Sequence, residues 1–314
     1  MGYKLAGYEH LGGVEIDPKI ADVYLENHKP KYLYVEDIRL FNKRNDLPAE
    51  LFDLDLLDGS PPCSTFSMAG SREKAWGKKK QFREGQAVQV LDDLVFEYVR
   101  TIDKLQPKVC LLENVRGIIQ GNAKAYSKEI VRQIQKSGYR VQVFLLNAAS
   151  MGVPQKRERV FFIGLRKDFD LPELSLRFDE MAIPFRQVKG SEFDRPLSAH
   201  YLKFWELRQV GDIDFSASSK RMGKNVNAQF QYKYIYNNDV ANTITAGEQC
   251  VLFDEPRHRS NIENILCGSY PLDYDFKGVE PKYLIGMSVP PVMTAQVANQ
   301  IWVQWLSKIK TKTT

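Results

Sequence analysis

Three short motifs place reactive side chains along the chain. "PPCS" carries Cys63 directly after an apolar run, and its two prolines fix φ and remove backbone donors, so the thiol has a rigid mount. "ENV" ends a second apolar run with Glu113, and "QKRER" spaces Arg157 and Arg159 so that both would face one way in a strand. A thiol in a loop at a strand end can act as a nucleophile, with a carboxyl and guanidinium groups to orient its target. Taken singly, these motifs also fit a structural cysteine, a solvated glutamate and a solvated strand edge.

The elements that must position these residues follow an α/β pattern. Short β-branched runs alternate with amphipathic stretches over the first two thirds of the chain, which is typical of a parallel sheet covered by helices. The expected strands are 11–17, 51–59, 109–115, 139–148 and 159–166, and the expected helices are 18–28, 89–105 and 122–138. Because ligands bind at the carboxyl ends of strands in such sheets, Cys63 and Glu113 should lie close together if their strands are neighbours.

The last third has a different pattern. Residues 229–238 alternate aromatic and polar side chains, which predicts a strand, and the turn-rich sequence that follows predicts a hairpin with 241–247. Residues 290–310 begin with prolines and carry apolar residues at helical spacing, which predicts a closing helix.

Composition excludes several classes of protein. The 314 residues carry a net charge of +5, and neither the four cysteines nor the four histidines have paired or metal-ligand spacing. We therefore expect no disulfide framework and no metal site. No apolar run approaches the ~20 residues that span a bilayer, so a cytoplasmic protein is expected. A cysteine hydrolase is disfavoured because no histidine lies in a recognisable partner motif.

Taken together and in this order, "PPCS", "ENV" and "QKRER" resemble the DNA (cytosine-5) methyltransferase family of bacteria and phages. "VEIDPKIADVYLENH", "EDI" and "YLIGMSVPPVMTAQVANQI" resemble further motifs of that family. The resemblance implies the doubly wound, mostly parallel sheet of S-adenosylmethionine-dependent methyltransferases, with a small mixed target-recognition domain. The expected division is a catalytic domain at 1–185, a recognition domain at 186–255 and a segment at 256–314 that returns to the catalytic domain.

The resemblance also implies a covalent mechanism on a flipped base. Cys63 would add to carbon 6 of cytosine, so that carbon 5 could take the methyl group of S-adenosylmethionine. Glu113 would bind the N3 and N4 edge of the ring, while Arg157 and Arg159 would bind its O2 atom.

Cofactor and DNA contacts follow from the same resemblance. Glu15 would bind the ribose hydroxyls, Ile16 would pack on adenine, and Asp37 and Ile38 would read the adenine edge. Further cofactor contacts are expected at Pro62, Leu94, Ser288 and Val289. Double-stranded DNA would meet a basic loop after Cys63, of net charge +4 over 71–84, and a basic segment at 216–238. The expected DNA-contacting residues are Ser67, Arg72, Lys78, Lys79, Lys80, Gln155, Lys220, Arg221 and Lys224. A restriction endonuclease of the same system would be a further partner.

The chain departs from the family pattern at two places. The family's opening strand and glycine-rich turn, which cradle the methionine end of the cofactor, are not found; that strand belongs beside the one that carries Glu15. A start upstream of Met1, a strand from another polypeptide, or a loss of cofactor binding would each account for this, and the first is favoured because the four catalytic residues are present. Met287 also stands where the family usually has asparagine. The alternative functions are a DNA-binding subunit that needs a partner for the missing motif, and an RNA cytosine-5 methyltransferase.

Overall fold

A computed structural model describes residues 1–62, 93–121, 123–191, 193–223, 230–245, 247 and 249–309. The chain divides into two compact units. The sheet unit comprises Glu9–Leu146, Glu158–Arg177 and Val297–Thr314, and the second unit comprises Met1–Tyr8, Asn147–Arg157 and Phe178–Gln296. Residues 256–296, which were expected to return to the catalytic domain, thus belong to the same unit as 186–255.

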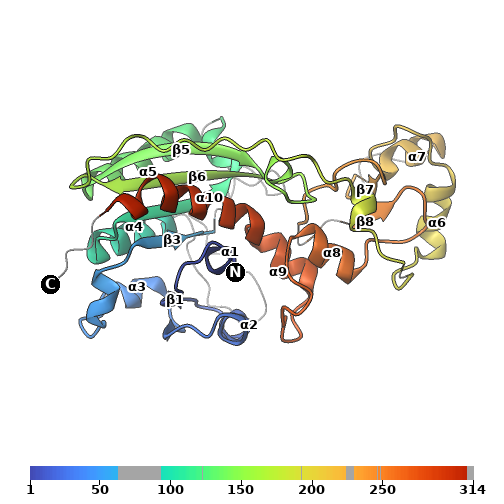
Figure 1. Ribbon diagram of the computed structural model, residues 1–314. Coiled ribbons are helices and arrows are strands. Elements are labelled where there is room, and N and C mark those ends of the chain that lie inside the picture. Colours follow the sequence, from blue (N-terminus) through green and yellow to red (C-terminus); the bar gives the residue numbers. More distant parts are fainter. Residues whose placement is uncertain are drawn as a thin grey trace. The chain divides into compact units, whose positions relative to one another are not determined.

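The strands of the sheet unit form two separate sheets (Figure 1). In the first, β1 (Gly12–Val14) pairs in parallel with β2 (Tyr32–Tyr34). In the second, the order is β3-β4-β6-β5, where β3 is parallel to β4 and β4 is antiparallel to β6. The bounds of these strands are Leu56–Gly59 for β3, Val109–Val115 for β4, Tyr139–Asn147 for β5 and Glu158–Arg166 for β6. Among the residues that the structure describes, β1 pairs with β2 alone, and the resemblance assigns the absent strand a place beside β1.

Helix α2 begins and ends at residues that are typical of helix ends. The Asp17 side chain accepts a hydrogen bond from the Lys19 backbone (2.9 Å) and Pro18 occupies the first turn of α2, while Lys29 ends the helix in the left-handed conformation. The sheet unit contains the helices α2 (Pro18–His28), α3 (Ile38–Phe41), α4 (Leu94–Leu105) and α5 (Ala123–Lys136), with short 3-10 helices at Ala49–Phe52, Arg116–Ile119 and Leu306–Lys308.

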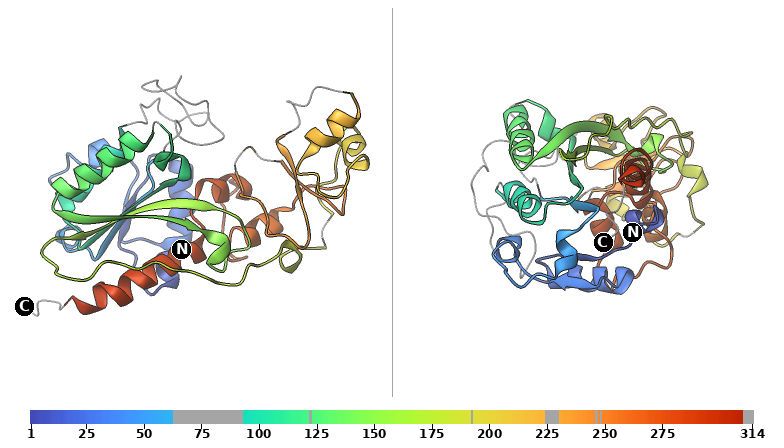
Figure 2. Two further views of the ribbon diagram at one scale, coloured as in Figure 1. Left: turned by 90° about the horizontal axis from the view of Figure 1, so that it is seen from above. Right: turned by 60° about the vertical axis from the view of Figure 1, so that its left-hand side comes forward.

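The core of the sheet unit lies between α4, α5 and one face of the larger sheet. Ile102 of α4, Leu112 of β4, Ile130 of α5 and Phe162 of β6 are fully buried in one cluster. Side chains alternate along a strand, so the odd-numbered residues of β4 face the other side. The C-terminal part of α10, from Val297, lies along that other side (Figures 1 and 2). Both faces of β4 are covered, which explains its almost continuous apolar sequence.

The second unit contains a small parallel sheet and a cluster of aromatic residues. β7 (Tyr232–Ile235) pairs in parallel with β8 (Gln249–Leu252), so the predicted hairpin with 241–247 is wrong. Parallel neighbours need a crossover connection, and the segment predicted as the second hairpin strand belongs to that connection. Helices α6 (Ala199–Glu206) and α7 (Phe215–Arg221) pack their phenylalanines on the tyrosines of β7.

The second unit also contains further short helices and the start of α10. They are α1 (Gly2–Leu5), α8 (Asn261–Cys267), α9 (Pro281–Met287) and the start of α10 (Pro291–Gln304), with 3-10 turns at Ala148–Ser150 and Phe185–Gln187. In the described part of the chain, no helix is long and apolar enough to cross a membrane.

Candidate active site

The backbone just before the proposed nucleophile is hydrogen-bonded to the end of β4. Cys63 itself lies outside the described residues, but Pro61 and Pro62 are described and half-buried. The Asn114 side chain donates to the Pro61 carbonyl oxygen (3.3 Å) and accepts from the Val115 backbone (2.9 Å). The residue after Glu113 therefore fixes the backbone two positions before Cys63, a role that the motif alone did not reveal.

Tyr98 of α4 ties together the two strands that lead to these motifs. Its hydroxyl group lies 2.9 Å from the Leu57 carbonyl oxygen of β3 and 2.7 Å from the Leu111 carbonyl oxygen of β4. At Gly59, a Cβ atom would lie 2.5 Å from the ring of Tyr98, so only glycine fits where β3 ends. The spacing of β3 and β4 therefore depends on the ring of Tyr98 and on glycine, which has no side chain, at position 59.

Glu113 and Arg159 form a buried ion pair on one face of the larger sheet. The Arg159 Nε atom lies 2.8 Å from the Glu113 Oε1 atom, with exposed side-chain fractions of 13% and 10%. Arg159 is paired in register with Val115, two residues beyond Glu113, so the ion pair is a diagonal cross-strand contact. Burial lowers the pKa of Arg159, and the carboxylate of Glu113 opposes that shift. This arrangement brings together two of the four expected catalytic residues.

Arg157 and Gln155 are buried among backbone carbonyl groups. Arg157 is 1% exposed, and its guanidinium donates to three backbone carbonyl oxygens, those of Ile244 (2.8 Å), Gly286 (2.8 Å) and Ser288 (2.6 Å). Gln155 is fully buried, donates to the Cys267 carbonyl oxygen (3.0 Å) and accepts from Ile244. In this arrangement both side chains bond to backbone groups of the second unit, and their contacts with cytosine and DNA stay a prediction. The strand pattern had not shown that β6 begins only at Glu158.

Two carboxylates follow the ends of adjacent parallel strands. Glu15 comes directly after β1, where its side chain accepts from the Asp17 backbone (2.8 Å) and burial raises its pKa. Asp37 follows β2 and begins α3, where its Oδ1 atom accepts from the Arg39 backbone (2.8 Å). Because β1 and β2 are parallel, both carboxylates lie at one edge of their sheet. Acceptors of this kind suit the hydroxyl and amino groups of a nucleoside, so this edge fits the nucleoside end of S-adenosylmethionine.

The other expected cofactor residues occupy both units. In the sheet unit, Ile16 and Ile38 are half-buried, and Leu94 is buried at the start of α4. In the second unit, Ser288 ends α9 and accepts a hydrogen bond from the Tyr270 hydroxyl group (2.8 Å), and Val289 is half-buried. Residues 1–11 contain the short helix α1 and no strand.

The expected DNA contacts can be followed at two positions of α7. Lys220 is exposed, whereas Arg221 pairs with Asp212 and donates to the Leu207 carbonyl oxygen (3.0 Å). The other expected positions in the two basic segments lie outside the described residues, namely Ser67, Arg72, Lys78, Lys79, Lys80 and Lys224. Among the described residues, no group of three histidine, cysteine or carboxylate side chains could hold a metal ion.

Comparison with known proteins agrees with the motifs. The family model of C-5 cytosine-specific DNA methylases matches residues 1–302. Type II methyltransferase M.FnuDI of Fusobacterium nucleatum is 33% identical over 194 residues, which cover 62% of this chain and 51% of that protein. Type II methyltransferase M1.HphI of Haemophilus parahaemolyticus is 27% identical over 323 residues, which cover 96% and 82%. The matched region thus spans about half of M.FnuDI.

A solved structure supports the fold. A putative DNA modification methyltransferase from an Escherichia coli prophage superposes with a TM-score of 0.69 at 18% identity, over 98% of this chain and 95% of that one. The α/β fold expected from the motifs is confirmed. The chain belongs to the C-5 cytosine-specific DNA methylase family.

Proposed function

We propose that the protein transfers a methyl group from S-adenosylmethionine to carbon 5 of cytosine in double-stranded DNA. The observation that carries this proposal is the buried Glu113–Arg159 pair, next to Asn114 and the proline mount of Cys63. Glu113 lies near the end of β4 and Arg159 at the start of the antiparallel β6, and Cys63 follows the end of β3 by four residues in the sequence. A carboxyl and a guanidinium group together with a thiol suit attack on a pyrimidine. With this function we expect the protein to be cytoplasmic and to work beside a restriction endonuclease of the same system.

The chain's own residues have distinct tasks in this reaction. The thiolate of Cys63 adds to carbon 6 of a flipped cytosine, and the ring electron pair moves to N3, which takes a proton from the protonated form of Glu113. Carbon 5 then bonds to the methyl group, a base removes the proton of carbon 5, N3 returns its proton to Glu113, and the Cys63 thiolate is eliminated. Arg159 keeps the Glu113 side chain in place and neutralises it when no base is bound. Glu15 and Asp37 bind the nucleoside of the methyl donor, and the donor supplies the methyl group from its sulfonium centre.

DNA recognition is assigned to the second unit, where 186–255 would form the recognition domain. The exposed Lys220 would contact a phosphate, which makes affinity depend on salt concentration. Residues 1–185 would form the catalytic domain with the returning C-terminal segment.

The test is a covalent trap. Wild-type protein is incubated with S-adenosylmethionine and an oligonucleotide duplex that contains 5-fluorocytosine, in which the final proton removal is blocked. We expect an adduct at Cys63 by mass spectrometry, no adduct with Cys63→Ala, and an unchanged adduct with the control Cys250→Ala, since Cys250 is buried in β8. An adduct with Cys63→Ala would overturn the mechanism, and stronger labelling of tRNA than of DNA by tritiated donor would overturn the substrate.

A second candidate is supported by the separation of the two sheets. Leu11 and Glu15 bond to the backbone of β2 (3.0 Å each), so the backbone groups of Gly12 and Val14 point to the opposite edge of β1. An added parallel strand would suit that edge, and the protein would then be a DNA-binding subunit that a second polypeptide completes. Calorimetry separates the candidates: DNA binding without affinity for S-adenosylmethionine favours the subunit, whereas micromolar donor binding by this chain alone rejects it.

A further inference from the structure

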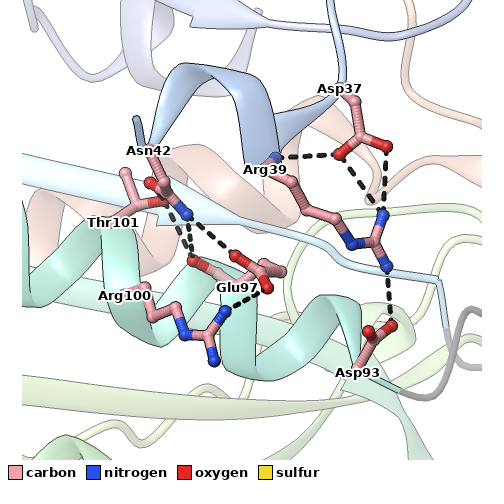
Figure 3. Close-up of polar contacts among 7 residues, drawn as sticks. All are labelled: Asp37, Arg39, Asn42, Asp93, Glu97, Arg100 and Thr101. Atoms are coloured by element: carbon pink, nitrogen blue, oxygen red, sulfur yellow. Dashed lines mark hydrogen bonds and ion pairs between the residues drawn. The ribbon is translucent and has the colours of Figure 1, made fainter. Parts of the chain in front are cut away.

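One arginine connects the starts of two helices that carry expected cofactor contacts. Arg39 of α3 donates through Nη1 to the Asp37 carboxylate (3.0 Å) and through Nη2 to the Asp93 carboxylate (2.7 Å). Figure 3 shows its guanidinium between these two carboxylates, one before α3 and one before α4. Asp37 and Asp93 directly precede Ile38 and Leu94, so the bridge joins the two positions expected to contact the cofactor.

The Asp93 side chain bonds to Arg39 and does not cap α4. Aspartate at the residue before a helix usually accepts from the backbone of the first turn. The Asp93 side chain makes no such bond in α4 and instead accepts from Arg39. Asp37 does both, because it caps α3 and pairs with Arg39.

A second polar cluster joins the same two helices farther from the cofactor edge. The Asn42 side chain donates to the Glu97 backbone carbonyl (3.0 Å), and the Thr101 hydroxyl group donates to the Asn42 Oδ1 atom (2.8 Å). Figure 3 shows this cluster along α4 beside the Arg39 bridge. Glu97 and Thr101 are buried, whereas Asp93 is 52% exposed. The buried cluster therefore serves the fold, and the exposed bridge adds little to stability.

We propose that Arg39 is a positioning residue for the nucleoside end of the methyl donor, and this inference rests on the proposed function. Arg39 holds the start of α3 at a fixed distance from the start of α4, and it orients the Asp37 carboxylate toward an amino group of the base. Its fork-shaped guanidinium can bind two carboxylates at once, which the single ammonium of lysine does less well. Because the bridge already orders these groups in the free protein, less conformational entropy is lost when the ligand binds.

The chain offers a matched control for this bridge. Arg44 also joins two carboxylates, those of Glu36 (3.3 Å) and Asp46 (2.7 Å), and its side chain is exposed to a similar extent. That bridge joins residues that precede and follow α3 and has no contact on α4 among these pairs. Replacing either arginine by glutamine removes the same charge from the same unit of the protein.

The experiment measures the affinity of the full chain for S-adenosylhomocysteine by calorimetry. We expect Arg39→Gln to raise Kd about tenfold, since a hydrogen bond to a charged group is lost from its orienting position. Arg44→Gln should leave Kd unchanged, and Arg39→Lys should lie between wild type and Arg39→Gln. Steady-state assays with DNA should show a higher KM for the donor at an unchanged kcat, a division that a general loss of structure would not produce.

Asp93→Asn tests the connection to α4 with Asp37 and Arg39 intact. It should raise Kd as Arg39→Gln does, and the double variant should be no weaker than either single variant, because both remove the same bridge. Thr101→Val should lower the unfolding temperature without changing Kd.

The outcomes separate this inference from the proposed function. If wild-type protein does not bind S-adenosylhomocysteine, the cofactor assignment fails and the inference fails with it. If wild type binds and either Arg39→Gln or Asp93→Asn binds as tightly, the inference alone is overturned. If Arg39→Gln does not fold, as shown by circular dichroism, Asp93→Asn decides the question.

Discussion

Replacing Glu113 by glutamine tests the ion pair that is central to the proposed site. The substitution keeps the shape of the side chain but removes the counter-charge of Arg159, whose Nε atom lies 2.8 Å from the carboxylate. Breaking a buried ion pair by removing one partner costs about 3–5 kcal/mol. Both side chains are still 10–13% exposed to solvent, which weakens the penalty for an unpaired charge. We therefore expect a loss of unfolding free energy at the lower end of that range, about 3 kcal/mol.

The same variant should lose activity by more than its stability loss explains. A general acid contributes about 10²–10⁴-fold to a rate, so methyl transfer should fall by about that factor under conditions where the variant is folded. Urea unfolding measures the first quantity, and transfer of tritiated methyl groups to DNA measures the second.

Glu158→Gln is the matched control for this experiment. Glu158 is adjacent to Arg159 and pairs with Arg116 (2.7 Å), but the two side chains are 38% and 48% exposed. Loss of this surface pair should change stability by about 0.5 kcal/mol or less. If Glu113→Gln is as stable as Glu158→Gln, the pair has no structural role, and if it is equally active, Glu113 is not the catalytic carboxyl group.

Three further substitutions test other parts of the chain. Glu263→Gln should cost about 3 kcal/mol in urea unfolding, because it leaves fully buried Arg257 without a bidentate partner (2.8 and 2.9 Å); a cost below about 1 kcal/mol would refute this. Gly59→Ala should destabilise by about 1–3 kcal/mol, since the added methyl group meets Tyr98 at 2.5 Å; an unchanged unfolding curve would refute the close packing. Burial raises the pKa of Glu15 above its unfolded value, so its contribution to stability is present at low pH and is lost as pH rises through the folded pKa. Glu15→Gln should therefore be more stable than wild type at pH 8 but not at pH 4, and a constant difference between the two proteins would contradict the sign.

Local pattern was a good guide to the elements of the sheet unit. The strand at 109–115 and the helix at 18–28 were predicted with the bounds that the structure shows. In both, a continuous apolar run or a capping aspartate with proline determines the backbone over a few residues. The run at 51–59 was less informative, because its first residues form a 3-10 helix and only Leu56–Gly59 pair with β4.

The sequence did not predict the contacts between distant segments. Gln155 and Arg157 have the sequence of a strand start with basic side chains, yet both are buried by backbone carbonyl groups from residues more than eighty positions away. Nothing in their own neighbourhood reports those acceptors. The contact between Arg39 and Asp93 was not predicted for the same reason, since the two residues are 54 positions apart in the sequence.

The sequence alone determined the family, the order of the strands and helices from β3 to β6, and the residue types of the proposed chemistry, because motif spacing and hydrophobic period are properties of neighbouring residues. Only the tertiary structure decided that Glu113 pairs with Arg159, that β7 and β8 run parallel, and that the strands of the sheet unit form two sheets. Those outcomes depend on which apolar surfaces pack against one another and lose their contact with water. The segments that carry these surfaces are far apart in the sequence, so a local sequence pattern does not show which of them pair.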